Sequence, residues 1–186
     1  MYLIEHSSTS GILNVSKAIK RKETKMYFDS VTTLDELKAA YKRLALKNHP
    51  DMGGNLRTMQ AINTEYDSMF AVLKAKHNAK AATDDSTRAT TETPEEYRQV
   101  VEAIINLDGI EVELCGCWLW VSGDTYTHKD ALKAAGFRWS RTKKMWYWHH
   151  AEDGQHWSRG RKSMEEIRNT YGSEKLGYTK HNSLVA

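Results

Sequence analysis

The 186-residue sequence contains only two cysteines, Cys115 and Cys117, and they stand one residue apart. This spacing is too short for an ordinary disulfide framework and is typical of a chain kept in a reducing compartment. No apolar run approaches the roughly 18 residues of a membrane span, and the N-terminal "MYLIEHSSTSG" lacks the charged-then-apolar pattern of a secretory signal. We therefore expect free thiols, no membrane partner and a cytoplasmic location.

The patterns that mark catalytic chains are missing as well. No nucleophile with a partnering base, no glycine-rich phosphate loop and no pair of carboxylates stands out in the sequence. We therefore expect this chain to be no enzyme, with no catalytic residues and no cofactor.

Zinc is the one metal that the sequence brings into question. The candidate ligands are Cys115, Cys117, His128, His149, His150 and His156. Structural zinc sites usually separate paired cysteines by two to four residues, whereas a Cys-x-Cys pair in a strand points both side chains to one face. The spacing favours small strand residues beside a turn, and we predict that no metal is bound.

What the chain does have is charge, and the charge is unevenly distributed. Residues 1–80 carry 13 Lys and Arg against 8 Asp and Glu, residues 81–109 carry 2 against 7, and residues 110–186 carry 12 against 9. Two basic parts therefore flank an acidic joint. This layout permits acidic partners at either end, but it is too mild to establish nucleic-acid binding.

Two helices are predicted in the first basic part. Thr33 and Glu36 form a capping box before apolar positions that recur at helical spacing, which predicts a helix from Leu34 to Asn48. A second periodic stretch predicts a helix from Leu56 to Lys76. The two helices are long enough to pack as an antiparallel hairpin.

The turn between these helices begins with His49, Pro50 and Asp51. Pro50 has no N–H and forces His49 toward an extended backbone, which ends the first helix at Asn48. A helix stop needs only the proline and a glycine, so the two ionisable side chains call for another explanation. The basic residues of the first helix lie opposite its apolar face: Lys38, Lys42, Arg43 and Lys47. A basic face of this kind usually only meets solvent, but this one leads directly into the tripeptide.

The stretch "YKRLALKNHPD" resembles the second helix and HPD loop of J-domain co-chaperones, and "GGNLRTMQAINTEYDSMF" resembles their third helix. The preceding "KMYFDSVTT" resembles an abbreviated form of their short first helix. This resemblance covers residues 26–76 and implies a hairpin that docks on a DnaK-type chaperone ATPase and stimulates ATP hydrolysis. It assigns the chaperone-binding loop to His49, Pro50 and Asp51, with supporting contacts from Tyr41, Lys42, Arg43 and Lys47. Nothing resembles the client-binding domains of full-length members, so the C-terminal part has to recruit a client protein.

The sequence divides into four parts: an N-terminal arm (1–25), the J-like domain (26–77), a linker (78–92) and a C-terminal module (93–186). The linker is predicted to be flexible because it is small, polar and without period. In the module, Pro94 opens a helix, and "IEVELCGCWLWVSGD", "THKDALKAAG" and "FRWSRTKKMWYWHH" predict a ββαββ order. Finally, "SMEEIRNTYG" predicts a short terminal helix. The predicted fold class is therefore α+β.

The C-terminal module combines cations with aromatic residues, and it weakly resembles small phage and mobile-element domains of uncertain role. Its candidate nucleic-acid-binding residues are Arg138, Arg141, Lys143, Lys144, Trp146 and Trp148. In one interpretation the cations pair with phosphates and the aromatics stack on bases. In the other, which we prefer, the aromatics form the core of a small sheet and the cations decorate a turn.

The sequence thus favours a J-domain co-chaperone whose C-terminal module recruits a client protein. The alternative is a nucleic-acid-binding phage or plasmid regulatory protein in which the J-like hairpin is vestigial or a decoy.

Overall fold

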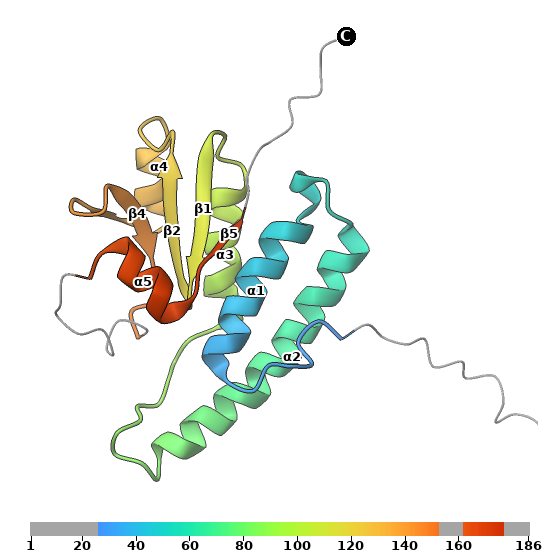
Figure 1. Ribbon diagram of the computed structural model, residues 1–186. Coiled ribbons are helices and arrows are strands. Elements are labelled where there is room, and N and C mark those ends of the chain that lie inside the picture. Colours follow the sequence, from blue (N-terminus) through green and yellow to red (C-terminus); the bar gives the residue numbers. More distant parts are fainter. Residues whose placement is uncertain (1–25, 153–161, 177–186) are drawn as a thin grey trace, which may run out of the picture.

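The computed structural model describes residues 26–152 and 162–176, and Figure 1 shows their arrangement. The predicted N-terminal arm and His156 lie outside the described residues. The chain combines helices with one antiparallel sheet, so the predicted α+β class is confirmed. In chain order the elements are α1 (Leu34–Asn48), the 3-10 turn η1 (Pro50–Met52), α2 (Leu56–Ala81), α3 (Pro94–Ile105), β1 (Ile110–Cys115), β2 (Trp118–Gly123), α4 (Lys129–Ala134), β3 (Arg138–Ser140), β4 (Met145–Trp148), α5 (Met164–Tyr171) and β5 (Glu174–Leu176).

The helices α1 and α2 run in opposite directions side by side (Figure 1). α1 has the predicted bounds, and Thr33 and Glu36 form the predicted capping box at its start. The rings of Tyr41 and Tyr66 stack between the two helices with their centroids 3.9 Å apart. α2 continues past its predicted end at Lys76 and stops at Ala81. Neither α2 nor any other helix of the described ranges is long and apolar enough to cross a membrane.

Residues 26–33, which resemble a shortened first helix, form a turn and contain no helix. The backbone N–H groups of Tyr27 and Phe28 donate to the carboxylate of Glu65 on α2 at 2.9 to 3.0 Å. The side chain of Phe28 is buried in the core. The carboxylate thus satisfies backbone donors that a helix would have paired internally.

The sheet has the strand order β3-β4-β2-β1-β5. Four of its strands and α4 reproduce the predicted ββαββ order, and the β1–β2 connection turns at Gly116. The predicted terminal helix is α5, which starts with a capping box between Ser163 and Glu166. The fifth strand, β5, was not predicted, because three residues are too few to show an alternating pattern.

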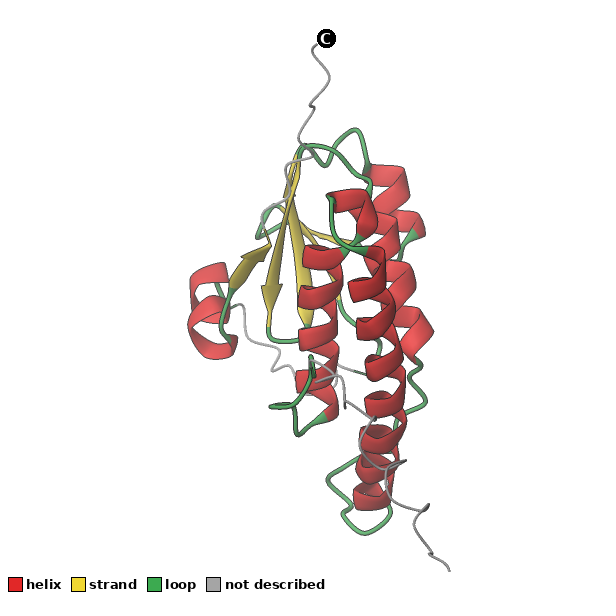
Figure 2. Cartoon of the chain, turned by 90° about the vertical axis from the view of Figure 1, so that its right-hand side faces the viewer, coloured by secondary structure: helices red, strands yellow, loops and turns green. Residues whose placement is uncertain are grey.

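One face of the sheet shares a core with the helical hairpin, and Figure 2 shows helices gathered on that side and a short helix on the other. The shared core takes residues from α1, α2, α3, α4 and the sheet, including Leu37, Tyr66, Tyr97, Val112, Leu119 and Leu132. On the opposite face, Ile167 of α5 packs with Trp118 and Trp120. The hairpin and the sheet are therefore parts of one hydrophobic unit.

The segment 78–92, predicted to be a flexible linker, is held against the rest of the protein. The backbone N–H of Thr91 donates to Glu152 Oε1 at 3.2 Å, and the Lys38 ammonium donates to both Glu92 carboxylate oxygens at 3.1 Å. Thr90 and Glu92 are buried. The linker prediction is wrong because a small polar composition carries no information about long-range hydrogen bonds.

Candidate docking loop and charged clusters

The loop between α1 and α2 has a tightly specified backbone. His49 is extended, with φ −62° and ψ 137°, and Pro50–Met52 then form a 3-10 turn. Gly53 has φ +80°, a left-handed conformation that glycine adopts without steric cost. A Cβ on Gly54 would lie 2.1 Å from the carbonyl oxygen of Asn48, so only glycine fits there. The sequence His-Pro-Asp-Met-Gly-Gly therefore specifies one sharp, rigid bend.

The two ionisable side chains of this loop differ in exposure. The Asp51 side chain is 50% exposed, whereas that of His49 is only 17% exposed. The reason is local: the His49 ring turns back over the bend, and its Nδ1 accepts the Asp51 backbone N–H at 3.3 Å. The side-chain amide of Asn106, which follows α3, donates to Oδ2 of the Asp51 carboxylate at 3.4 Å. The loop thus presents the Asp51 carboxylate and part of the His49 ring.

Two of the predicted supporting residues, Tyr41 and Lys42, are buried, which corrects their assignment as chaperone contacts and the placing of Lys42 on an exposed basic face. The Tyr41 side chain packs between α1 and α2, and its hydroxyl donates to Asn63 at 3.1 Å. Lys42 is 0% exposed, and its ammonium donates to the Cys117 carbonyl oxygen. The same ammonium lies 5.0 Å from the ring centroids of Tyr97 and Trp148. Helical spacing could not predict this, because it does not show which face a distant segment will cover.

The other two supporting residues, Arg43 and Lys47, lie at the rim of the contact between α1 and the sheet. Both bind Glu174 at the start of β5, and the Arg43–Glu174 distance is 3.4 Å. The side chains of Arg43 and Lys47 are 44% and 52% exposed. Their cations, Lys47 first, lower the pKa of Glu174 below its ordinary range. Arg43 and Lys47 thus remain accessible to a partner, although each already has an acidic neighbour.

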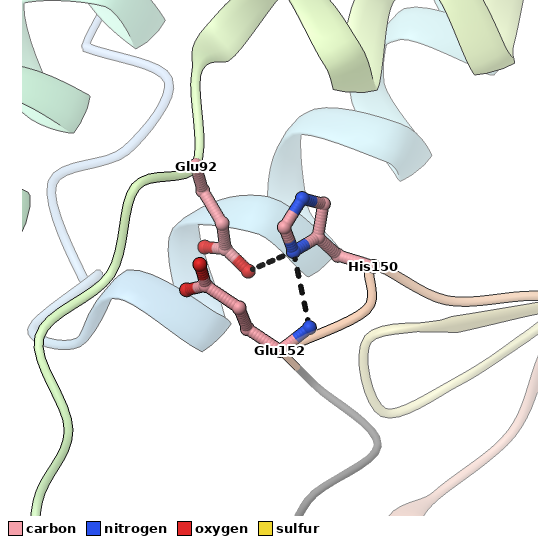
Figure 3. A group of neighbouring side chains, drawn as sticks. All are labelled: Glu92, His150 and Glu152. Atoms are coloured by element: carbon pink, nitrogen blue, oxygen red, sulfur yellow. Dashed lines mark hydrogen bonds and ion pairs between the residues drawn. The ribbon is translucent and has the colours of Figure 1, made fainter.

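A buried charged cluster lies near the start of α1. Figure 3 shows the side chains of Glu92, His150 and Glu152 facing one another. Their potential ligand atoms lie within 4.8 Å of one another and could hold a metal ion. The ammonium of Lys38 already supplies a positive charge beside Glu92, because it lies 3.1 Å from both oxygens of that carboxylate. His150 Nδ1 is 3.1 Å from the same carboxylate. Sequence reasoning missed this cluster, since Lys38, Glu92 and His150 are each more than 50 residues apart along the chain.

The cysteines are absent from this cluster. Within the described ranges, the potential metal ligands gather in a group of three only at Glu92, His150 and Glu152. Both cysteines are free thiols, and burial raises the pKa of Cys115 to about 12. A thiol with so high a pKa is a poor metal ligand and a poor nucleophile at neutral pH.

The candidate nucleic-acid residues divide into buried and exposed groups. Trp146 and Trp148 are 7% and 8% exposed and belong to the core, so their assignment to base stacking is wrong. Lys143 is half-buried, with its ammonium 5.8 Å from the centroid of the Trp120 ring. The remaining cations are exposed: Arg138, Arg141 and Lys144. The aromatic side chain of Trp139 is 45% exposed, and that of Tyr126, which the sequence analysis did not consider, is 80% exposed.

No family model, curated protein or solved structure matches this chain. Its function therefore has to be inferred from the loop at residues 49–51, from Arg43 and Lys47 on α1, and from the exposed cations and aromatics around β3.

Proposed function

We propose that this chain is a J-domain-type co-chaperone that docks on a DnaK-type chaperone ATPase through His49, Pro50 and Asp51 and stimulates ATP hydrolysis. One observation carries the proposal: the tripeptide occupies the rigid bend of an antiparallel hairpin, with the Asp51 carboxylate half exposed. A rigid loop loses little conformational entropy on binding, which favours its use as a contact site. The resemblance of residues 26–76 to J domains supplies the identity of the partner.

The accessible rim of α1 supports an acidic docking surface on that partner. Arg43 and Lys47 extend from the helix that leads into the loop, and their exposed charges can steer an acidic protein toward it. Their bonds to Glu174 are those of exposed ion pairs, which are weak enough for a partner to displace. Tyr41 and Lys42 take no part, because both are buried. Docking thus involves the loop and the rim of α1.

The rest of the proposal concerns the client and the compartment. The C-terminal module, residues 93–186, which we call the sheet half, presents surfaces away from the loop. These surfaces recruit a client protein to the chaperone. The cytoplasmic location expected from the sequence belongs to the same proposal.

The test is single-turnover ATP hydrolysis by a DnaK-type chaperone of the native host, with and without this protein. Wild type should accelerate hydrolysis, and His49→Gln or Asp51→Asn should abolish the acceleration. Both changes should alter the free energy of unfolding by no more than about 1 kcal/mol, because the loop side chains are outside the core. Arg43→Gln should weaken stimulation, most strongly at low salt, because a rim charge mainly sets the encounter rate.

Lys80→Gln is the matched control, since it removes one exposed charge from the far end of α2. This control should stimulate hydrolysis as wild type does. If wild type gives no stimulation, or if the His49 and Asp51 variants stimulate equally well, the co-chaperone proposal fails. The tripeptide would then serve only as a helix terminator.

A further inference from the structure

Two aromatic side chains are exposed at one end of the sheet. Tyr126 follows β2 and is 80% exposed, while Trp139 lies on the edge strand β3 and is 45% exposed. Strand register places their surroundings at the same end: Val121 pairs with Trp146, and Trp146 pairs with Trp139. The β2–α4 connection and the β3–β4 turn therefore both leave the sheet beyond these pairs. We call this region, from Asp124 to Lys144, the aromatic corner.

Both rings of the aromatic corner are supported from one side. Trp139 meets the buried Trp146 edge to face, with ring centroids 5.5 Å apart. The ammonium of Lys129 lies 5.0 Å from the centroid of Tyr126. Such contacts hold a ring in place and leave its other surfaces open, so both rings are suited to stacking on a flat ligand.

The aromatic corner is also basic. Residues 124–144 contain six Lys and Arg against two Asp, a net charge of +4, whereas the whole chain has +3. The exposed cations of the corner are Lys129, Lys133, Arg138, Arg141 and Lys144. Lys144 has φ +52°, a conformation that glycine or asparagine adopts more easily, so the turn keeps a lysine where its geometry does not favour one.

We propose that the aromatic corner binds single-stranded nucleic acid, with Tyr126 and Trp139 stacking on bases and the surrounding cations binding phosphates. Cations alone would suit any polyanion. Exposed aromatic rings add a contact that only unpaired bases can complete, because a duplex buries its base faces in the stack. This surface is independent of the docking loop, so the proposal stands or falls separately from the co-chaperone function.

Fluorescence anisotropy of the full chain with labelled oligonucleotides tests this proposal. The probes are a dT 20-mer, a U 20-mer and a mixed-sequence 20-base-pair duplex, measured between low and high salt. The single strands should bind more tightly than the duplex, and comparing the dT and U probes distinguishes DNA from RNA as the ligand. Trp139→Ala and Tyr126→Ala should each weaken single-strand binding about tenfold, the typical loss for one base stack.

Charge removal gives a second, independent readout. The double variant Arg141→Gln/Lys144→Gln should reduce the slope of log affinity against log salt by about 1.4, because a single strand releases about 0.7 counterion per phosphate contact. Its matched control is Lys76→Gln/Lys80→Gln, which removes two exposed charges from α2 and should leave binding unchanged.

Several results would overturn the proposal. One is the absence of binding at low salt, and another is duplex binding as tight as single-strand binding, with the aromatic variants unaffected. A third is equal competition by poly-glutamate, which would show that the corner recognises acidic chains in general. Thermal unfolding of each variant verifies that the exposed substitutions leave the fold intact.

Discussion

The basic row of α1 consists of Lys38, Lys42, Arg43 and Lys47. The sequence does not distinguish these four residues, but in the fold the first two are buried and the last two are exposed. Lys38 and Lys42, one helical turn apart, are 2% and 0% exposed beneath the sheet half. Arg43 and Lys47, also one turn apart, lie at the rim with side chains 44% and 52% exposed. The buried half is bound by the carboxylates of Asp35 and Glu92, a backbone carbonyl and aromatic rings. The rim half shares one half-exposed carboxylate.

This difference shows that the partners on the covering segment decide the role of a lysine more than its position on a helix. Burying an ammonium costs several kcal/mol unless hydrogen bonds and opposite charge compensate, and the sheet half supplies these groups at Lys38 and Lys42. At the rim, water solvates the cations and the ion pairs add little. The buried half should therefore control stability, and the rim half should control association.

Reversing the charge at the centre of the buried half should have the largest effect. Lys42→Glu would place a carboxylate beside the Cys117 carbonyl oxygen and the faces of two aromatic rings. We expect it to lower the free energy of unfolding by at least about 3 kcal/mol, since it buries a charge that its neighbours repel. Urea unfolding followed by far-UV circular dichroism measures the change.

Lys42→Met is the matched control, because it keeps the length of the side chain and removes the charge. It should change stability by no more than about 1.5 kcal/mol in either direction. A Lys42→Glu protein as stable as wild type would mean that this half of α1 is open to solvent, and the comparison with the rim would fail.

Removing the carboxylate of the buried half should have the next largest effect. Glu92→Gln would remove the buried carboxylate that lies 3.1 Å from the Lys38 ammonium and leave that ammonium beside the Asp35 carboxylate, which is 2.8 Å away and 76% exposed. We expect a loss of about 2 to 4 kcal/mol in the free energy of unfolding, as for other broken buried ion pairs. The double variant Lys38→Met/Glu92→Leu should recover part of this loss, and a cost below about 0.5 kcal/mol for Glu92→Gln alone would show that the pair is solvated.

The same contrast explains what could be predicted from the sequence. The capping boxes at Thr33, Thr93 and Ser163 and the bend at Pro50 depend on residues a few positions apart, and the three predicted helices that begin at these boxes and the predicted bend all formed. Strand β5 was not predicted from the sequence, because its three residues form a strand only by pairing with β1. Local patterns therefore predicted most elements but left their assembly open.

The candidate sites divide in the same way. The bend at His49 was predicted in position and shape, since proline and glycine geometry is local. The burial of Lys42, Trp146 and Trp148 depends on long-range packing, so the sequence could not distinguish a binding face from a core. Tyr126 and Trp139 become candidate binding residues only through their exposure in the fold, because no periodic pattern in the sequence marks them.

The rim half should show a smaller, pH-dependent effect. Because Lys47 and Arg43 lower the pKa of Glu174 from its ordinary value of 4.5, the stabilisation is fully present above that value and is lost as the pH falls through the lowered one. Glu174→Gln should therefore cost less than about 1 kcal/mol at pH 7, and this difference from wild type should shrink toward pH 3 and in high salt. Thermal unfolding from pH 7 to 3 tests this, with exposed Glu102→Gln on α3 as the control. A Glu174→Gln effect that persists unchanged at pH 3 would contradict it.

The smallest effect is expected from metal removal at the buried half. Glu92, His150 and Glu152 could together hold an ion, but the Lys38 ammonium already neutralises the Glu92 carboxylate, and a divalent cation would have to lie beside that positive charge. We therefore expect a chelator, or added zinc, to leave the melting temperature of the wild type unchanged. Lys38→Met sharpens the test, because removing the ammonium opens the carboxylate and should allow zinc to raise the melting temperature of that variant alone. Elemental analysis that finds one equivalent of tightly held zinc in the purified wild type would overturn this prediction and make the cluster a metal site.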